Sequence, residues 1–132
     1  MSIALGLFII RLVVGLSFIA HGAQKLFGWF GGYGLKGTGG WMESLGMKPG
    51  VLMALMAGLG EFVGGLLFAA GLLTPVGAGL IAITMLFAII SVHGKNGYWN
   101  TANGYEMNLL IIAVVVGVSL IGAGAYSLDA IL

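Results

Sequence analysis

Residues 51–92, VLMALMAGLGEFVGGLLFAAGLLTPVGAGLIAITMLFAIISV, decide the fold. This stretch contains two apolar runs, Val51–Leu73 and Val76–Val92, which only Thr74 and Pro75 separate. Each run is close to the length of about 20 residues that spans a hydrocarbon core about 30 Å thick. A spanning segment has to satisfy its own backbone hydrogen bonds, which favours a helix. The short connection therefore predicts two antiparallel membrane helices joined by a tight turn.

Two further apolar runs flank this pair. Ile3–Ala20 is interrupted only by Arg11, and Met107–Ala125 carries Asn108 near its start. Of the 132 residues, 60% are apolar and 7% are charged, whereas a soluble domain carries about 25% charged residues. The sequence thus predicts an all-α fold, an integral membrane four-helix bundle that forms a single domain over residues 1–132. The helices are expected near residues 3–25, 50–73, 75–93 and 105–124.

The composition also excludes several classes of function. The chain has no cysteine, which excludes thiol redox chemistry and thiolate ligation of an iron–sulfur cluster. Its net charge is +1 and it has no basic run, so nucleic acid is not an expected partner. No zinc, copper or nucleotide-binding motif is present, and no metal is expected. We interpret the methionines at positions 42, 47, 53, 56, 85 and 107 as residues that fill gaps in the packing.

A long segment rich in glycine and aromatic residues separates the first two predicted helices. Residues 21–50 contain ten glycines together with Phe27, Trp29, Phe30, Tyr33 and Trp41. We interpret the segment as an interfacial loop whose rings lie at headgroup depth. One short helix is predicted within it, over residues 38–45.

The lysines predict the orientation of the bundle. With four spans, the two longer connections share one side of the membrane, and Lys25, Lys36, Lys48 and Lys95 lie on that side. Both termini lie on the other side, which carries Asp129 and no lysine or arginine outside the membrane. The positive-inside rule therefore predicts cytoplasmic long loops and termini outside.

Arg11 and Glu61 are charges within the predicted spans. A charge near the membrane centre costs about 3 kcal/mol, so each is either paired or functional. At about 1.5 Å per residue, Arg11 lies about 12 Å and Glu61 about 18 Å from the same membrane side. We therefore predict that Arg11 pairs with Glu61, and Asp129 is the alternative partner if Arg11 extends outward. Small residues at positions 54, 58 and 65 share the helical face of Glu61, which predicts that this face points into the bundle. Either a structural pair or a charge lining a ligand or proton path fits this pattern.

A second polar group is expected at the end of the bundle that carries the long loops. The first and third helices run parallel, and their histidines lie at matched depths, so we predict that His21, Lys25, His93 and Glu106 converge. The side chains there offer donors, acceptors and a stacking face. A quinone or lipid head group, bis-histidine haem, or polar residues bonded to one another would each fit, although one histidine per helix is a weak signal for haem. The candidate ligand-binding residues are His21, Lys25, His93, Tyr98, Trp99, Tyr105, Glu106 and Asn108, and no residue is assigned as catalytic.

Five segments together resemble one family. They are RLVVGLSFIAHGAQKLFG (11–28), GGWMESLGMKPG (39–50), GLGEFVGGLLFAAGLLTP (58–75), GYEMNLLIIA (104–113) and GAGAYSLDAIL (122–132). In this order the chain resembles DoxX proteins. The resemblance implies a four-helix protein of the bacterial cytoplasmic (inner) membrane. The family is named for a small subunit associated with a thiosulfate:quinone oxidoreductase, and relatives accompany responses to quinones, catechols and oxidants. By position, the resemblance singles out Arg11, His21, Lys25, Glu61, Glu106 and Asp129, none of which is an established catalytic residue.

Three functions fit these features. The favoured one is a membrane subunit of a redox or quinone-linked system, at most an accessory subunit of an oxidoreductase. Such a subunit would bind a quinone-like or lipid head group and hold no cofactor tightly. The second is a scaffold or assembly factor that recruits a soluble partner such as an oxidoreductase. The third is a small proton-coupled transporter that uses Glu61 and forms a homo-oligomer.

Overall fold

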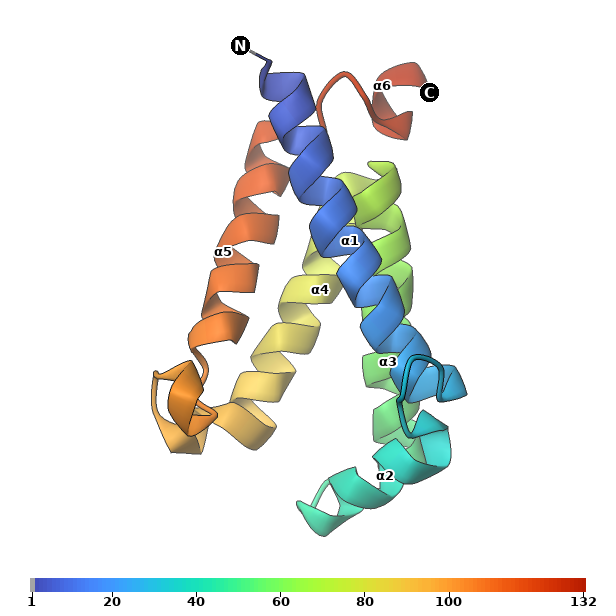
Figure 1. The fold of residues 1–132 in the computed structure, drawn as a ribbon. Helices are drawn as coiled ribbons and strands as arrows, with labels where there is room; N and C mark the ends of the chain where they lie inside the picture. Colours follow the sequence, from blue (N-terminus) through green and yellow to red (C-terminus); the bar gives the residue numbers. More distant parts are fainter. Residues whose placement is uncertain (1) are drawn as a thin grey trace.

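The computed structural model describes residues 2–132 and consists of helices and their connections (Figure 1). The five longest helices are α1 (Ile3–Phe27), α2 (Gly34–Ser44), α3 (Gly50–Ala70), α4 (Thr74–Ala88) and α5 (Glu106–Ile121). Short helical turns complete the chain: η1 (Ile89–His93), η2 (Gly94–Asn96), η3 (Asn100–Ala102) and α6 (Leu128–Ile131). The predicted all-α class is confirmed.

Three helical stretches are long and apolar enough to cross a membrane. They are α1, α3 and the continuous stretch Thr74–Asn96, which comprises α4, η1 and η2. The apolar helix α5 has 16 residues, or about 24 Å at 1.5 Å per residue, and is shorter than a hydrocarbon core. The helices α1, α3, α4 and α5 alternate in direction, so both termini lie at one end and the two long connections at the other (Figure 1). The number of spans itself stays a prediction.

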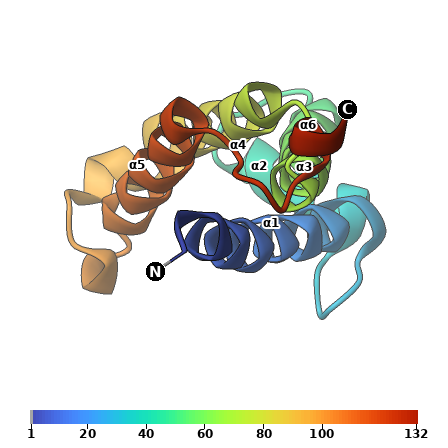
Figure 2. The ribbon, with the colours of Figure 1, turned by 90° about the horizontal axis from the view of Figure 1, so that it is seen from above.

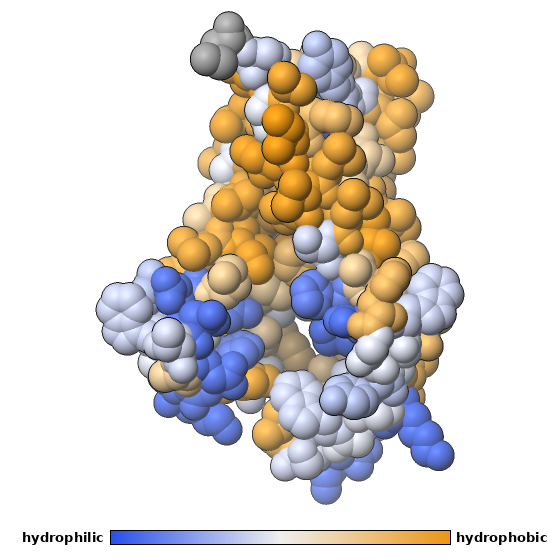
Figure 3. All heavy atoms as spheres, in the orientation of Figure 1, coloured by the Kyte–Doolittle hydropathy of each residue, from blue (hydrophilic) through white to orange (hydrophobic). Residues whose placement is uncertain are grey.

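The helices pack in chain order around a common apolar core. Viewed from above, α1 lies along one side, and α3, α4 and α5 follow one another along the other (Figure 2). All four helices contribute to the core, through Leu7, Phe18, Phe68, Ala78, Ile81, Met85, Val115 and Val118. Apolar side chains cover most of the visible surface, whereas polar side chains gather at the end that carries the long connections (Figure 3). This distribution fits a protein whose helices lie in a bilayer.

Glycines bring α1 and α3 into close backbone contact. A Cβ at Gly15 would lie 2.6 Å from the backbone nitrogen of Ala69, and one at Gly22 would lie 2.6 Å from that of Phe62. Small residues drive helix association in membranes by this kind of approach. The small-residue face of α3 therefore points inward as predicted, and Glu61 on that face is buried.

Arg11 is buried and satisfied by backbone carbonyl groups. Its side chain is 1% exposed. The guanidinium donates hydrogen bonds to the carbonyl oxygens of Phe68 (3.3 Å), Ala69 (3.1 Å), Ala123 (2.8 Å) and Tyr126 (3.0 Å). The first two belong to the last turn of α3, whose carbonyl oxygens can accept hydrogen bonds from outside the helix. Arg11 thus ties the end of α3 to the chain that follows α5.

The predicted pairing of Arg11 with Glu61 is wrong. Gly15 lies against Ala69, near the end of α3, so residues 3–14 of α1 project beyond α3. Distances counted along α1 and α3 from their own ends therefore do not share one reference plane, and Arg11 meets the end of α3 instead of Glu61. Among residues 2–132, Arg11 forms no ion pair with the alternative partner Asp129 either.

Asp129 instead holds the N-terminus of α4. Its carboxylate accepts hydrogen bonds from the backbone nitrogens of Leu73 (2.8 Å) and Thr74 (3.1 Å) and from the Thr74 hydroxyl (2.7 Å). A carboxylate at this position satisfies free N–H groups and interacts favourably with the helix dipole. The hydrogen bonds from Thr74 hold the pKa of the Asp129 carboxyl below its usual range.

Several helix ends differ from the sequence-based boundaries. The short loop helix begins at Gly34 instead of residue 38, and the first helix extends to Phe27. The second spanning helix ends three residues early, at Ala70, because Gly71 adopts a left-handed conformation with φ +65°. The third helix is regular only to Ala88 and continues as the π-helical turn Ile89–His93, which the apolar pattern does not distinguish from regular helix.

Candidate ligand-binding site

A buried ion pair joins α1 to α3 at the polar end. Lys25, in the last turn of α1, places its Nζ 2.5 Å from Oε1 of Glu61. The Glu61 side chain is 5% exposed and that of Lys25 is 26% exposed. Gly58 permits this contact, since a Cβ there would lie 3.3 Å from the Lys25 Cβ and 2.8 Å from a methyl group of Leu26. Lys25 therefore neutralises the carboxylate of Glu61 and also reaches the surface.

Lys25 also lines a cleft between the end of α1 and α2. The cleft has a volume of about 660 Å³ and is lined by Gln24, Lys25, Gly31, Gly32, Tyr33, Gly37, Thr38 and Trp41. Its outer wall is the turn between α1 and α2, in which Gly28, Gly31 and Gly34 have positive φ. The side-chain nitrogen of Gln24 donates to the carbonyl oxygen of Phe30 at 3.1 Å and holds this turn. We call this space the outer cleft.

A smaller space lies on the other side of Lys25 and Trp41. We call it the inner cavity. It has a volume of about 180 Å³, and the residues that line it come from α1, α2, the turn after α2, α3, α4, η1 and α5. Lys25 and Trp41 line both spaces, which are therefore neighbours. Figure 3 shows the molecule hollowed at this end, between α2 and the connection that precedes α5. The inner cavity is lined by Lys25, Trp41, Met42, Met47, Ala57, Thr84, Met85, Phe87, Ala88, Ser91, Val92, His93 and Asn108.

The structure brings some of the predicted site residues together. Lys25, His93 and Asn108 line the inner cavity. The Asn108 side-chain nitrogen contacts the Met85 sulfur at 3.5 Å, and Nδ1 of His93 lies 2.9 Å from the carbonyl oxygen of Asn103. Their roles as ligand-binding residues stay predictions.

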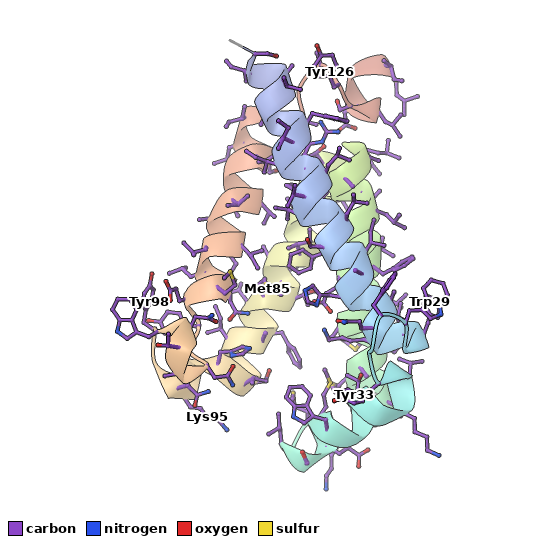
Figure 4. All side chains as sticks on the ribbon, in the orientation of Figure 1. Trp29, Tyr33, Met85, Lys95, Tyr98 and Tyr126 are labelled. Carbon is purple, nitrogen blue, oxygen red and sulfur yellow. The ribbon has the colours of Figure 1, made fainter. Side chains whose placement is uncertain are left out.

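The other candidates line neither space. His21 lies against Phe18, with ring centroids 6.1 Å apart. Glu106 accepts a hydrogen bond from the backbone nitrogen of Asn100 at 3.0 Å and so orders the connection before α5. The remaining three form an aromatic cluster on that connection, in which Tyr98 lies 5.1 Å from Trp99 and 5.6 Å from Tyr105 between ring centroids. Figure 4 shows Tyr98 and Trp29 at opposite sides of the polar end.

Sequence reasoning missed the Lys25–Glu61 pair and the place of Trp41. The sequence does contain a signal for the ion pair. Gly15 and Gly22 on the first helix are seven residues apart, and so are Gly58 and Gly65 on the second. In an antiparallel crossing Gly15 faces Gly65 and Gly22 faces Gly58. In the structure a Cβ at Gly65 would lie 2.6 Å from the Gly15 carbonyl oxygen. That register places Glu61 near the end of α1. The sequence does not separate Trp41 from the other aromatic residues of the segment 21–50, because nothing in its spacing distinguishes it.

Residues 2–132 contain no cluster of the side chains that most often bind metal ions. No three His, Cys, Asp or Glu side chains in that range lie close enough to hold a metal ion. The residues that line the outer cleft offer a ligand one ammonium group, a side-chain amide, hydroxyls and aromatic faces.

Comparisons with known proteins place the chain among membrane proteins. The DoxX family model matches residues 6–94. A Bacillus subtilis protein named "Putative oxidoreductase CatD" is 29% identical over 128 residues, which cover 97% of this chain and 87% of that protein. An uncharacterised Haemophilus influenzae protein is 35% identical over 123 residues, covering 91% of this chain and 85% of its own. An uncharacterised membrane protein of Mycobacterium tuberculosis is 31% identical over 130 residues, which cover 91% of this chain and 77% of that protein. No solved structure matches.

Proposed function

Because the chain belongs to the DoxX family of membrane proteins, we propose that it is the membrane component of a redox system and binds a quinone-like head group in the outer cleft. One relative is named as a putative oxidoreductase, which supports the redox assignment. The chain carries no cysteine and therefore has no thiol redox chemistry of its own. In this proposal the chain binds the redox molecule and a partner enzyme supplies the electrons.

The outer cleft is the observation that carries this proposal. Its volume of about 660 Å³ falls within the range of about 300–1,000 Å³ typical of small-molecule sites. Lys25 uses one N–H on Glu61 and retains two others for the carbonyl oxygen of a ligand. Tyr33 and Trp41 provide faces on which a flat ring can stack. Gly31, Gly32 and Gly37 leave room for the ring between them.

The position of the cleft suits a lipid-soluble ligand. It lies at the end of α1, where the apolar surface gives way to the polar end of the molecule (Figure 3). A quinone head group could bind Lys25 at this level while its isoprenoid tail stays among the lipid chains. We further propose a bacterial cytoplasmic membrane with this end in the cytoplasm, since the four lysines of the long connections all lie at it.

Binding of short-chain quinones to the detergent-purified protein tests the proposal. Decyl-ubiquinone and a short-chain menaquinone are titrated, and bound ligand is measured by equilibrium dialysis. Loss of a hydrogen bond to a charged group costs about 1.5–3 kcal/mol, so Lys25→Gln combined with Glu61→Gln should weaken binding about tenfold or more. Tyr33→Leu, on a residue that is 83% exposed and contributes little to the fold, should weaken it less.

Lys36→Met is the matched control, because Lys36 is an exposed lysine of α2 that does not line the cleft. It should leave quinone affinity unchanged. Equal affinity of the parent and the Lys25/Glu61 double variant would contradict the proposed site. Absence of any quinone binding, together with retention of a soluble oxidoreductase during mild extraction, would favour the scaffold function instead.

A further inference from the structure

A groove opens between α3 and α4 on the apolar surface of the molecule. We call it the α3–α4 groove. It has a volume of about 130 Å³ and is lined by Met53, Met56, Ala57, Ile83, Thr84 and Phe87. Met56 and Ile83 are exposed, and both belong to helical stretches long and apolar enough to cross a membrane. The groove therefore faces the lipid chains when these helices lie in a bilayer.

The spacing between α3 and α4 changes at Thr84. The two helices are in close contact there, since a Cβ at Gly60 would lie 2.6 Å from the Thr84 hydroxyl oxygen. One turn closer to the polar end, α3 carries Ala57 and α4 carries Phe87, and both residues line open space. The two helices therefore leave a gap between them on the polar side of the Gly60 contact.

This gap connects the lipid-facing surface with the proposed quinone site. The α3–α4 groove and the inner cavity share three lining residues, Ala57, Thr84 and Phe87. The inner cavity and the outer cleft share Lys25 and Trp41. The three spaces therefore lie in a row, with the groove at the lipid end and the outer cleft at the other.

The polar side chains along the inner cavity already have partners. The hydroxyls of Thr84 and Ser91 donate to carbonyl oxygens four residues earlier in the same helical stretch, at 2.8 and 2.5 Å. The side-chain nitrogen of Asn108 contacts the sulfur of Met85. Within residues 2–132, no buried side-chain nitrogen or oxygen lacks a hydrogen-bond partner. An apolar occupant would therefore leave no polar group of the wall unsatisfied.

Most methionines of the chain lie along these two spaces. Of the seven methionines, Met42, Met47 and Met85 line the inner cavity, and Met53 and Met56 line the groove. Methionine is unbranched and flexible, so it adapts its shape to irregular apolar neighbours and is common at adaptable binding surfaces. A wall of this composition suits a flexible apolar chain better than a rigid ring.

We propose that the ligand is a prenylated quinone whose isoprenoid tail runs through the inner cavity and leaves through the α3–α4 groove into the lipid. This inference rests on the proposed function, because a head group in the outer cleft sets where the tail begins. The tail enters past Lys25 and Trp41, which are both partly exposed and can turn aside. Figure 4 shows Met85 farther from the polar end than Tyr33 of the outer cleft, so the path leads toward the membrane interior. Each space exceeds several-fold the volume of about 30 Å³ that one water molecule takes up.

Two ligands with the same ring test the tail separately from the head group. Menadione is the methylnaphthoquinone ring without a tail, and menaquinone-2 carries the same ring with two isoprene units. Each is titrated into the detergent-purified full-length protein, and bound ligand is measured by equilibrium dialysis. Ala57→Leu places a larger side chain where the groove meets the inner cavity. It should weaken menaquinone-2 binding about tenfold or more and leave menadione binding within about twofold of the parent. The ratio of variant to parent affinity cancels the partition of the tail into detergent micelles.

A second blocking variant and a matched control complete the set. Ala88→Leu changes a residue that lines the inner cavity but not the groove, and it should give the same pattern as Ala57→Leu. Ala113→Leu makes the same change at an exposed position of α5 that lines neither space, and it should bind both ligands as the parent does. In the blocking variants the leucine occupies empty space, so their unfolding temperatures should stay near that of the parent. Retained menadione binding in the same samples shows that the head-group site is still folded.

Three results would overturn the tail path, and they differ in what they say about the quinone site. Unchanged menaquinone-2 binding in both blocking variants would mean that the tail leaves the outer cleft by another route, and the quinone site would stand. An equal loss of menadione and menaquinone-2 binding would place the ring itself in the inner cavity. A parent protein that binds neither ligand would overturn the proposed function together with this inference.

Discussion

Replacing Lys25 by methionine should destabilise the protein more than replacing Glu61 by glutamine, although both changes remove the same ion pair. Lys25→Met leaves a carboxylate in a side chain that is 5% exposed, with no donor to replace the ammonium group. Breaking a buried pair in this way costs about 3–5 kcal/mol, because the remaining charge is uncompensated.

Glu61→Gln leaves the opposite partner in a different situation. The Lys25 side chain is 26% exposed and borders the outer cleft, so its ammonium group can turn toward water. The glutamine oxygen still accepts one hydrogen bond. We therefore expect a loss of about 1–2 kcal/mol, the scale of one weakened hydrogen bond. A difference of about 2 kcal/mol between the two variants changes the unfolding equilibrium constant about 30-fold.

Unfolding in mixed detergent micelles with increasing sodium dodecyl sulfate measures these losses. The double variant Lys25→Met/Glu61→Gln should be more stable than Lys25→Met alone, because no buried charge remains. Lys36→Met, at an exposed lysine of α2, should match the parent. Equal losses in the two single variants, or a double variant whose loss is their sum, would refute the inferred coupling.

Three further changes test the packing and the polar contacts at the other end. Gly15→Ala should lower the stability of the fold by about 1–3 kcal/mol, because the added Cβ would lie 2.6 Å from the Ala69 backbone. Gly6→Ala is the control, since nothing lies within 4 Å of its added Cβ, and it should leave the thermal melt unchanged. Arg11→Lys should lower stability by about 3 kcal/mol or more, because one ammonium group cannot replace a guanidinium bonded to four carbonyls. The pKa of Asp129 is lowered in the folded protein. Its carboxylate therefore stabilises the fold fully at pH values above the ordinary carboxyl pKa of about 3.9. This stabilisation is lost as the pH falls through the lowered pKa of the folded state. Protease cleavage near the C-terminus should therefore accelerate in acid, and Asp129→Asn should be cleaved fast at every pH.

The sequence predicts the fold more fully than it predicts the polar contacts. Apolar runs of spanning length and the two-residue connection at Thr74 are enough to infer four helices that alternate in direction. Helix pairing is set by close backbone approach, which depends on where Gly15 and Gly22 meet α3. Because α1 projects beyond α3, depth counted from each helix end assigned Arg11 the wrong partner.

The candidate site illustrates the same limit. Lys25, His93 and Asn108 were placed at the polar end from their positions in the chain, and the structure places them around one cavity. The contribution of α2 could not be inferred, because its position depends on the turn between α1 and α2 and on contacts with α3. The π-helical turn that orients His93 has no counterpart in the apolar pattern.

Photolabelling is the most direct test of the central claim, that this DoxX protein binds a quinone-like head group beside Lys25. The protein is reconstituted in lipid nanodiscs with an azidoquinone, irradiated, digested and analysed by mass spectrometry. We expect the label on peptides that contain Tyr33 or Trp41, and we expect excess unlabelled quinone to compete with it. Labelling spread over the lipid-facing surfaces of α4 and α5, without competition by unlabelled quinone, would contradict the claim.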